Sequence, residues 1–109
     1  MAEEIKQEEL QQVLEQNEVV IVDAWAPWCL PCKMMGKVLE EYQTDRPEYK
    51  IVKINVDEND KFAREYGILA IPTILIFKKG KLVGRIIGFK DKEDLDREIQ
   101  QVLENEGEK

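Results

Sequence analysis

Apolar and polar residues follow two different periods along the first half of the chain. A nearly continuous apolar run at 19–26 and alternating apolar positions at 50–57 predict two strands, the first of them covered on both faces. Helical spacing of apolar residues predicts one helix at about 7–16 and another that begins near position 29 and ends before Pro47. A strand, a helix and a second strand in this order predict two parallel strands joined by a right-handed crossover.

The second half of the chain begins with a short helix and a hairpin. The short helix is predicted at about 60–66, and two apolar strands follow at 73–78 and 82–87, with a turn through Lys79-Gly80-Lys81. Gly84, inside the second of these strands, predicts a bulge. The hairpin strands are antiparallel, so they join the parallel pair in a mixed sheet.

The chain ends in a predicted amphipathic helix. Apolar residues from Leu95 to Leu103 form one stripe after a capping residue at or near Asp91, and the charged segment 104–109 is expected to fray. No internal repeat, low-complexity tract or linker divides the sequence. We therefore predict one α/β domain over 1–109, with a mixed sheet of four or five strands flanked by helices on both faces.

Composition and charge exclude several classes of function. Sixteen basic and 23 acidic residues give the 109-residue chain a formal charge of −7, which argues against binding to nucleic acid or to an anionic membrane. The first residues lack the apolar core of a signal peptide, and the apolar stretch 68–77 is too short to span a membrane and contains Pro72. We therefore expect a cytoplasmic protein.

The only two cysteines, Cys29 and Cys32, lie where the first predicted strand passes into a helix. At a helix N-terminus, unpaired amide groups and the helix dipole stabilise a thiolate, which is the reactive form of cysteine. A Cys-X-X-Cys motif at such a junction therefore predicts a redox-active dithiol.

Two other uses of the cysteine pair are weaker. A disulfide between residues so close in sequence would contribute only roughly 2 kcal/mol by loop closure, so a purely structural bridge is a poor explanation. The chain has no histidine and only two cysteines, whereas a closed zinc site requires four nitrogen or sulfur ligands. A metal or cluster site would need two chains that share their thiols.

Asp23 interrupts the apolar run at 19–26. Burial on a doubly covered strand should raise the pKa of its carboxyl group, which makes Asp23 a candidate base near neutral pH. It could equally be a structural residue satisfied by backbone groups. Lys53 on the neighbouring strand could face Asp23, although a lysine at an alternating position is more often exposed to solvent.

These features together resemble the thioredoxin family over nearly the whole chain. The residues that carry the resemblance are Val22-Asp23-Ala24-Trp25-Ala26-Pro27-Trp28-Cys29, Pro31-Cys32-Lys33-Met34, Lys53-Ile54-Asn55-Val56-Asp57, Tyr66-Gly67-Ile68, Ile71-Pro72-Thr73 and Gly88. The resemblance implies a thioredoxin fold and a protein-disulfide reductase that acts as a monomer without a bound cofactor or metal. It also implies oxidised proteins as substrates, and recycling by an NADPH-linked or ferredoxin-linked thioredoxin reductase.

The resemblance also orders the chemistry of the site. Cys29, expected to be the more exposed cysteine, should attack a substrate disulfide, and Cys32 beneath it should resolve the mixed disulfide. Asp23 would accept the proton that Cys32 loses, with Lys53 beside it.

The resemblance further implies a docking surface next to the two cysteines. The matching proline of the family is cis, so Pro72 would leave the Ile71 backbone free to bind an extended substrate segment. The remaining residues expected on this apolar surface are Trp28, Pro31, Ala70 and Gly88. Trp28 could also serve ordinary packing, and Gly88 could be a turn residue with positive φ.

Three residues depart from the usual family pattern. Leu30 and Ala70 stand where glycine is common, and Lys37 replaces a proline of the second helix. We expect Leu30 to tune the reduction potential and leave the chemistry unchanged. Because neither residue between the cysteines donates a side-chain hydrogen bond to the thiolate, the sequence predicts a reductant. The alternative is a binding subunit that uses the docking surface without turnover.

Overall fold

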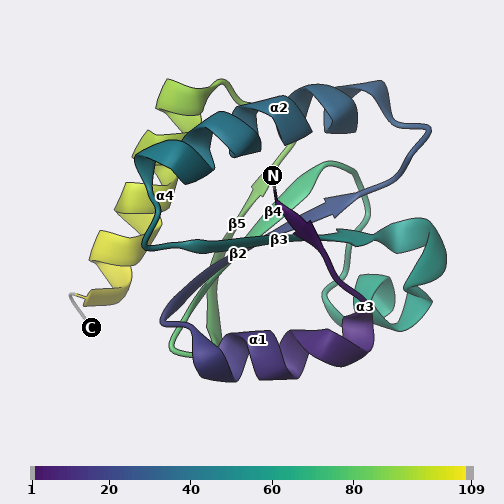
Figure 1. Cartoon of the computed structure of the whole chain (residues 1–109), viewed down its shortest axis with the longest axis horizontal. Coiled ribbons are helices and arrows are strands. Elements are labelled where there is room, and N and C mark those ends of the chain that lie inside the picture. Colours follow the sequence, from purple (N-terminus) through teal and green to yellow (C-terminus); the bar gives the residue numbers. More distant parts are fainter. Residues whose placement is uncertain (1, 108–109) are drawn as a thin grey trace.

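A five-stranded mixed sheet runs through the centre of the computed structural model, which describes residues 2–107 (Figure 1). The strands lie in the order β1-β3-β2-β4-β5, and the first three of these are parallel while β4 and β5 are antiparallel to their neighbours. Their bounds are β1 (Glu3–Glu4), β2 (Val19–Trp25), β3 (Lys50–Asn55), β4 (Thr73–Lys78) and β5 (Lys81–Ile87). The predicted mixed α/β sheet is therefore confirmed, with five strands.

Helices cover both faces of this sheet, as predicted (Figure 1). The α-helices are α1 (Leu10–Gln16), α2 (Leu30–Asp45), α3 (Asp60–Glu65) and α4 (Lys92–Gly107), and the 3-10 helices are η1 (Gln7–Glu9) and η2 (Val56–Glu58). Helices α1 and α3 pack on one face, and α2 and α4 pack on the other.

Alternation along β2 divides the core into two layers. Val20, Val22 and Ala24 pack toward α1 and α3, whereas Ile21 packs toward α2 and α4. Asp23 shares the face of Ile21, so this carboxyl group points into the layer beneath α2. The continuous apolar run seen in the sequence is explained by this double coverage, because both faces of β2 are buried.

The chain departs from the sequence predictions at its two ends. Strand β1 was not predicted, because its two residues are both glutamates and carry no apolar pattern; it forms by parallel pairing with β3 at the sheet edge. The segment 104–109 was expected to fray, but α4 continues to Gly107, since neither glycine nor proline interrupts it earlier. Residues 108–109 lie outside the described residues.

Gly84 lies at the predicted bulge. The β4–β5 register shifts between Ile76 and Phe77, which pair with Gly84 and Leu82, so Val83 is the extra residue. A Cβ atom added at Gly84 would come within 2.8 Å of the Val102 side chain of α4. The glycine therefore allows the last helix to pack closely against β5.

Candidate active site

The two cysteines lie at the junction of β2 and α2, where the sequence placed them. Cys29 is the N-cap of α2, and its backbone N–H donates to the Ala26 carbonyl at 3.2 Å, which closes the turn after β2. The Cys29 Sγ accepts the backbone N–H of Cys32 at 3.2 Å. Pro31 fits the first turn of the helix because its missing N–H would have no intrahelical partner there. The sulfur of Cys29 therefore occupies the position at which a helix N-terminus stabilises an anion.

Cys29 and Cys32 form a disulfide, with their Cα atoms 5.2 Å apart, so the structure is that of the oxidised protein. We expected Cys29 to be the more exposed of the two, but both side chains are buried, at 5% and 2% exposure. What separates them is their position. Cys29 follows the exposed Trp28 and precedes the helix, whereas Cys32 lies within its first turn and packs with Ala26.

The loop before β4 lies directly against the disulfide. The Ile71-Pro72 peptide bond is cis, as the resemblance implies, and the Ile71 carbonyl oxygen lies 3.8 Å from Cys29 Sγ. The Gly88 N–H donates to the Pro72 carbonyl at 2.9 Å, and Gly88 has a φ of 91°, a conformation that favours glycine. The structure therefore brings Cys29, Ile71, Pro72 and Gly88 together.

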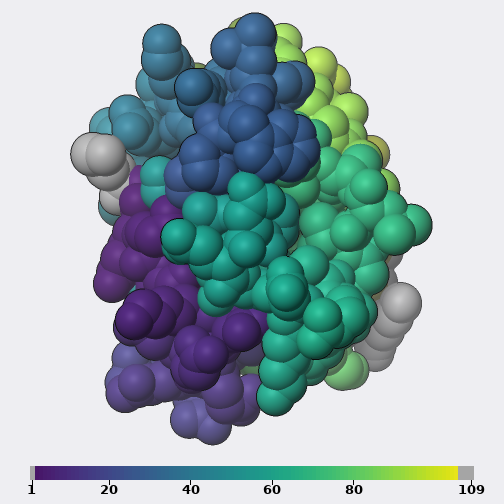
Figure 2. All heavy atoms as spheres, turned by 90° about the vertical axis from the view of Figure 1, so that its right-hand side faces the viewer, coloured from purple at the N-terminus to yellow at the C-terminus, as the bar shows by residue number. Residues whose placement is uncertain are grey.

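Exposed apolar side chains surround the disulfide. Trp28 is 71% exposed and Leu30 is 67% exposed, on either side of Cys29, while Leu69 beside the Ile71 loop is 98% exposed. Pro31 beside Leu30, Ala70 beside Leu69 and Phe89 beside Gly88 are also exposed. Figure 2 shows this end of the molecule, where the blue segment after β2 lies beside green segments from the second half of the chain.

The sequence analysis missed Leu69, Phe89 and Asp57 at this end of the molecule. The Trp28 indole Nε1–H donates to Asp57 Oδ2 at 2.9 Å, which orients the exposed ring. A usable signal was present for Leu69 and Phe89, because each is a large apolar residue in a loop and adjoins a predicted docking residue.

Asp23 is buried beneath α2 at 2% exposure. Its Oδ1 has no hydrogen-bond partner among residues 2–107. Burial raises the pKa of Asp23 to about 7, while the charge of Lys53 lowers it and that of Glu4 raises it. Lys53 pairs with Asp23 in the β2–β3 register, as predicted, and Lys53 Nζ lies 4.6 Å from the centroid of the Trp25 ring.

The packing of α2 places Asp23 below the cysteines. Ile21 packs with Met35 of α2, and Asp23 is two residues further along β2 on the same face. Cys32 is three residues before Met35, and α2 returns in the direction opposite to β2 (Figure 1). Moving from Ile21 to Asp23 therefore corresponds to moving from Met35 toward Cys32, so Asp23 lies toward the end of α2 that carries the cysteines.

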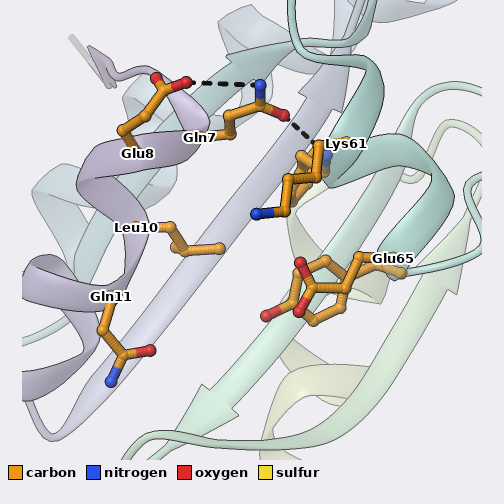
Figure 3. Close-up of a pocket in the computed structure, with 8 residues that line it drawn as sticks. Gln7, Glu8, Leu10, Gln11, Lys61 and Glu65 are labelled. Atoms are coloured by element: carbon orange, nitrogen blue, oxygen red, sulfur yellow. Dashed lines mark hydrogen bonds between the residues drawn. The ribbon is translucent and has the colours of Figure 1, made fainter.

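A pocket of about 170 Å³ between α1 and α3 lies on the other face of the sheet (Figure 3). Gln7 on its rim accepts the Phe62 N–H at 2.7 Å through Oε1, and its own backbone N–H donates to Asn59 Oδ1 at 2.9 Å. The first bond satisfies a free backbone N–H at the start of α3, and the second satisfies one at the start of η1. The polar groups of this pocket therefore hold two helices together and are separate from the disulfide.

Within residues 2–107, no three residues of the types His, Cys, Asp or Glu come together in a way that could hold a metal ion. No helix in the same range is long and apolar enough to cross a membrane.

Comparison with known proteins gives a consistent set of relatives. A family model described as Thioredoxin matches residues 1–101. A thioredoxin of Bacillus subtilis is 49% identical over 86 residues, covering 78% of this chain and 83% of the relative. A bifunctional thioredoxin reductase/thioredoxin of Mycobacterium leprae is 44% identical over 94 residues, which are 85% of this chain and 20% of that protein.

Solved structures agree with the sequence comparison. The oxidised form of mitochondrial thioredoxin 3 from Saccharomyces cerevisiae superimposes with a TM-score of 0.84 at 33% sequence identity. The match covers 92% of this chain and 94% of the yeast chain, so the similarity extends over the whole sheet and its helices.

Proposed function

Since the chain belongs to the thioredoxin family and is a thiol-disulfide oxidoreductase that reduces protein disulfides, we propose a role for each residue around its disulfide. Cys29 is the attacking cysteine, Cys32 the resolving cysteine and Asp23 the base. The observation that carries this assignment is the N-cap position of Cys29, whose sulfur accepts an amide N–H at the start of α2. The same environment would hold the Cys29 sulfur as a thiolate after reduction.

The reaction transfers two electrons from the dithiol to the substrate. The Cys29 thiolate attacks one sulfur of the substrate disulfide, so a Cys29–substrate bond forms and the first substrate thiolate leaves. The Cys32 thiol then gives its proton to the Asp23 carboxylate, and its sulfur attacks the Cys29 sulfur. The mixed disulfide breaks, and the second substrate thiolate leaves. The product is the Cys29–Cys32 disulfide seen in the structure.

Asp23 suits the role of base because its buried carboxyl group has a pKa raised to about 7. Near neutral pH, such a group is present in both its protonated and its ionised form, so it can accept the Cys32 proton and later release it. Lys53 balances the charge of the ionised form, as its position beside Asp23 in the β2–β3 register suggests.

Substrate binding uses the apolar surface around the disulfide. An extended segment of the substrate would lie along the Ile71 backbone, which is 3.8 Å from the reacting sulfur. Trp28, Pro31, Ala70 and Gly88 contribute to this docking surface. The exposed Leu30, Leu69 and Phe89 would favour substrates whose residues next to the reacting cysteine are also apolar.

A thioredoxin reductase would return the disulfide to the dithiol, using electrons from NADPH or ferredoxin. The Mycobacterium leprae relative, whose printed name joins thioredoxin reductase and thioredoxin, supports this type of partner. We place the protein in the cytoplasm as a monomeric reductant, because a reducing compartment keeps the dithiol available for a new cycle.

The alternative of a binding subunit without turnover is not favoured, because the chain's relatives are thioredoxins and its two cysteines lie at disulfide distance. Replacing both Cys29 and Cys32 by serine separates the two functions. If the proposed function is correct, this variant still binds substrates but cannot reduce insulin with dithiothreitol as the electron donor. A serine variant that still reduced insulin would contradict the assignment.

The order of the two cysteines is tested with single variants. Cys32→Ser should accumulate a stable mixed disulfide between Cys29 and the substrate, because the resolving sulfur is missing. Cys29→Ser should form no such adduct under the same conditions. Alkylation of the reduced wild-type protein should modify Cys29 first, and faster at neutral pH than an ordinary free thiol. Faster labelling of Cys32 would reverse the roles.

A further inference from the structure

Three charged residues from three adjacent strands form a row across the sheet. Glu4 of β1 pairs with Lys53 of β3, and Lys53 also pairs with Asp23 of β2. Directly paired residues of neighbouring strands point to the same face, so all three side chains lie on the face that α2 covers. Strands lie about 5 Å apart, which puts the backbone of Lys53 one strand from each of its two partners and the backbones of Glu4 and Asp23 about 10 Å apart.

The row leads from the interior to solvent. Asp23 is buried, Lys53 is partly buried and Glu4 is exposed at the sheet edge. The Glu4 side chain is nevertheless held in place, because its Oε2 accepts the backbone N–H of Asn55 at 3.2 Å. Asp23 has no comparable anchor, since its Oδ1 has no hydrogen-bond partner among the described residues.

The Lys53 ammonium group lies over the aromatic ring of Trp25. Lys53 Nζ lies 4.6 Å from the centroid of the Trp25 ring, and Trp25 follows Asp23 on the same face of β2. Contact with an aromatic face stabilises an ammonium group that has lost part of its hydration. The ammonium group is thus held on the face that carries both carboxyl groups, and it forms no ion pair within 4.0 Å among residues 2–107.

We propose that Glu4 is a positioning residue of the redox reaction. Its carboxylate interacts with the same Lys53 ammonium group as Asp23, and this competition keeps Asp23 able to accept the Cys32 proton near neutral pH. This proposal rests on the proposed role of Asp23 as the base. If Asp23 were the only carboxylate near Lys53, its ionised form would be more strongly stabilised and Asp23 would be a weaker base. Glu4 opposes that stabilisation.

The charges around Asp23 shift its pKa in the directions that this proposal requires. Burial is the largest cause of the raised pKa of Asp23, Lys53 lowers it and Glu4 raises it. The pKa of Glu4 is itself raised by burial, while Lys53 and the Asn55 N–H lower it and Glu58 raises it. The Trp25 indole also lowers the pKa of Glu4, although its Nε1 meets no hydrogen-bond partner by geometry within the described residues.

The other elements packed against Asp23 bring few titratable groups. On β4, the residue paired with Asp23 is Ile74, which carries no charge. On α2, the groups that face this layer are the Cys29 and Cys32 thiols of the reduced protein, whereas Lys33 and Lys37 are exposed. In the oxidised protein these thiols do not titrate, so the coupling of Glu4 to Asp23 can be measured without them.

The test compares Glu4→Gln with Glu3→Gln in the oxidised full-length protein. The two changes remove the same charge from adjacent residues of β1, but Glu3 pairs with Val52 and forms an ion pair with Lys50 at 2.9 Å. The glutamine at position 4 can still accept the Asn55 N–H through its amide oxygen, so the strand keeps its anchor. The readout is the titration of the Asp23 carboxyl carbon by NMR.

Glu4→Gln should move the Asp23 titration midpoint downward by roughly half a pH unit at low salt, because an exposed charge two strands away is partly screened. Glu3→Gln should move it far less. In a Lys53→Gln background the effect of Glu4→Gln should shrink, since the shared ammonium group is gone. Equal shifts for the two glutamates, or an undiminished shift without Lys53, would overturn the proposal.

A kinetic measurement separates this proposal from the role of Asp23 itself. The rate at which Cys32 resolves a mixed disulfide with a small aromatic thiol should depend on pH, and Glu4→Gln should move that dependence in the same direction as the NMR titration. If the NMR midpoint moves and the kinetic midpoint does not, Asp23 is not the base, and both assignments fail. If the NMR midpoint is unchanged, only the role of Glu4 fails.

Discussion

Asp96 and Asp23, two aspartates on the side of the sheet that α2 covers, have opposite surroundings. Asp96 of α4 accepts a hydrogen bond from the Tyr42 hydroxyl at 2.8 Å and pairs with the Arg46 guanidinium at 3.0 Å. Burial raises the pKa of Asp96, but hydrogen bonds from Tyr42 and Arg46 outweigh it, so the pKa is lowered. Asp23 is more deeply buried, has an unpartnered oxygen, and its pKa is raised to about 7.

The difference sets the structural role of Asp96 against the chemical role that we propose for Asp23. A carboxylate that accepts hydrogen bonds from Tyr42 and Arg46 stays ionised and links α4 to α2, which stabilises the fold. A buried carboxylate with an unpartnered oxygen is expensive to ionise, so it holds its proton to a higher pH, which is the property that the proposed role of Asp23 requires. Substitutions at Asp23 and Asp96 test this contrast.

The stability of the oxidised protein should depend on Asp23 in a defined pH range. Because its folded-state pKa is raised from 3.8 to about 7, the folded protein keeps this proton longer than the unfolded chain, and stability is lost as pH rises between these values. Asp23→Asn removes this loss and should increase the free energy of unfolding at pH 8 by up to about 4 kcal/mol. Urea unfolding between pH 4 and pH 8 provides the measurement.

Asp96→Asn is the matched control for that experiment. A lowered folded-state pKa contributes stability above the unfolded value, and this contribution is lost as pH falls through the folded value. The control should therefore differ from the wild type in the acid range and should not remove the loss of stability between pH 4 and pH 7. Parallel curves for wild type and Asp23→Asn would show that Asp23 has an ordinary pKa.

The rate of resolution should fall when Asp23 loses its carboxyl group. At pH 7, Asp23→Asn should slow the attack of Cys32 on the mixed disulfide by about 100-fold, the typical contribution of a positioned base. Stopped-flow detection of the released aromatic thiol follows this step. Asp96→Asn should keep the wild-type rate, and a normal rate in Asp23→Asn would mean that another group accepts the proton.

Removal of the Asp96 side chain should affect stability and leave turnover unchanged. Asp96→Ala leaves the Tyr42 hydroxyl, on an almost fully buried residue, without its acceptor, and should lower the free energy of unfolding by about 1–3 kcal/mol. Tyr42→Phe in the same background should recover part of this loss, because the unpaired hydroxyl is gone. No recovery in the double variant would assign the cost to lost packing.

The smallest effect is expected at the exposed Leu69. Leu69→Ser should raise KM for protein disulfides with apolar flanking residues a few-fold, since burying part of one such side chain is worth about 1 kcal/mol. Stability should not change, because Leu69 is 98% exposed. A small disulfide without flanking residues is the control substrate and should be reduced at the wild-type rate. An equal loss for both substrates would place Leu69 outside the docking surface.

Much of the fold could be predicted from the sequence because its signals are local. The apolar run of β2, the helical stripe of α2 and the glycine in β5 each report which faces of one element are buried. Strand β1 had no such signal. Its two residues are both glutamates at the sheet edge, and only their pairing with the β3 backbone makes them a strand. Asp23 was found as a candidate base because a charge inside an apolar run is visible without a structure.

By itself, the sequence determined the order of the elements, the placement of Cys29 and Cys32 at a helix start, and the burial of Asp23. The tertiary structure alone decided that the Ile71 carbonyl lies against Cys29, and that Glu4, Lys53 and Asp23 pair across three neighbouring strands. Periodicity records whether a side chain faces the core or solvent. Contacts between distant segments depend on strand order and register, which the packing of the whole chain selects.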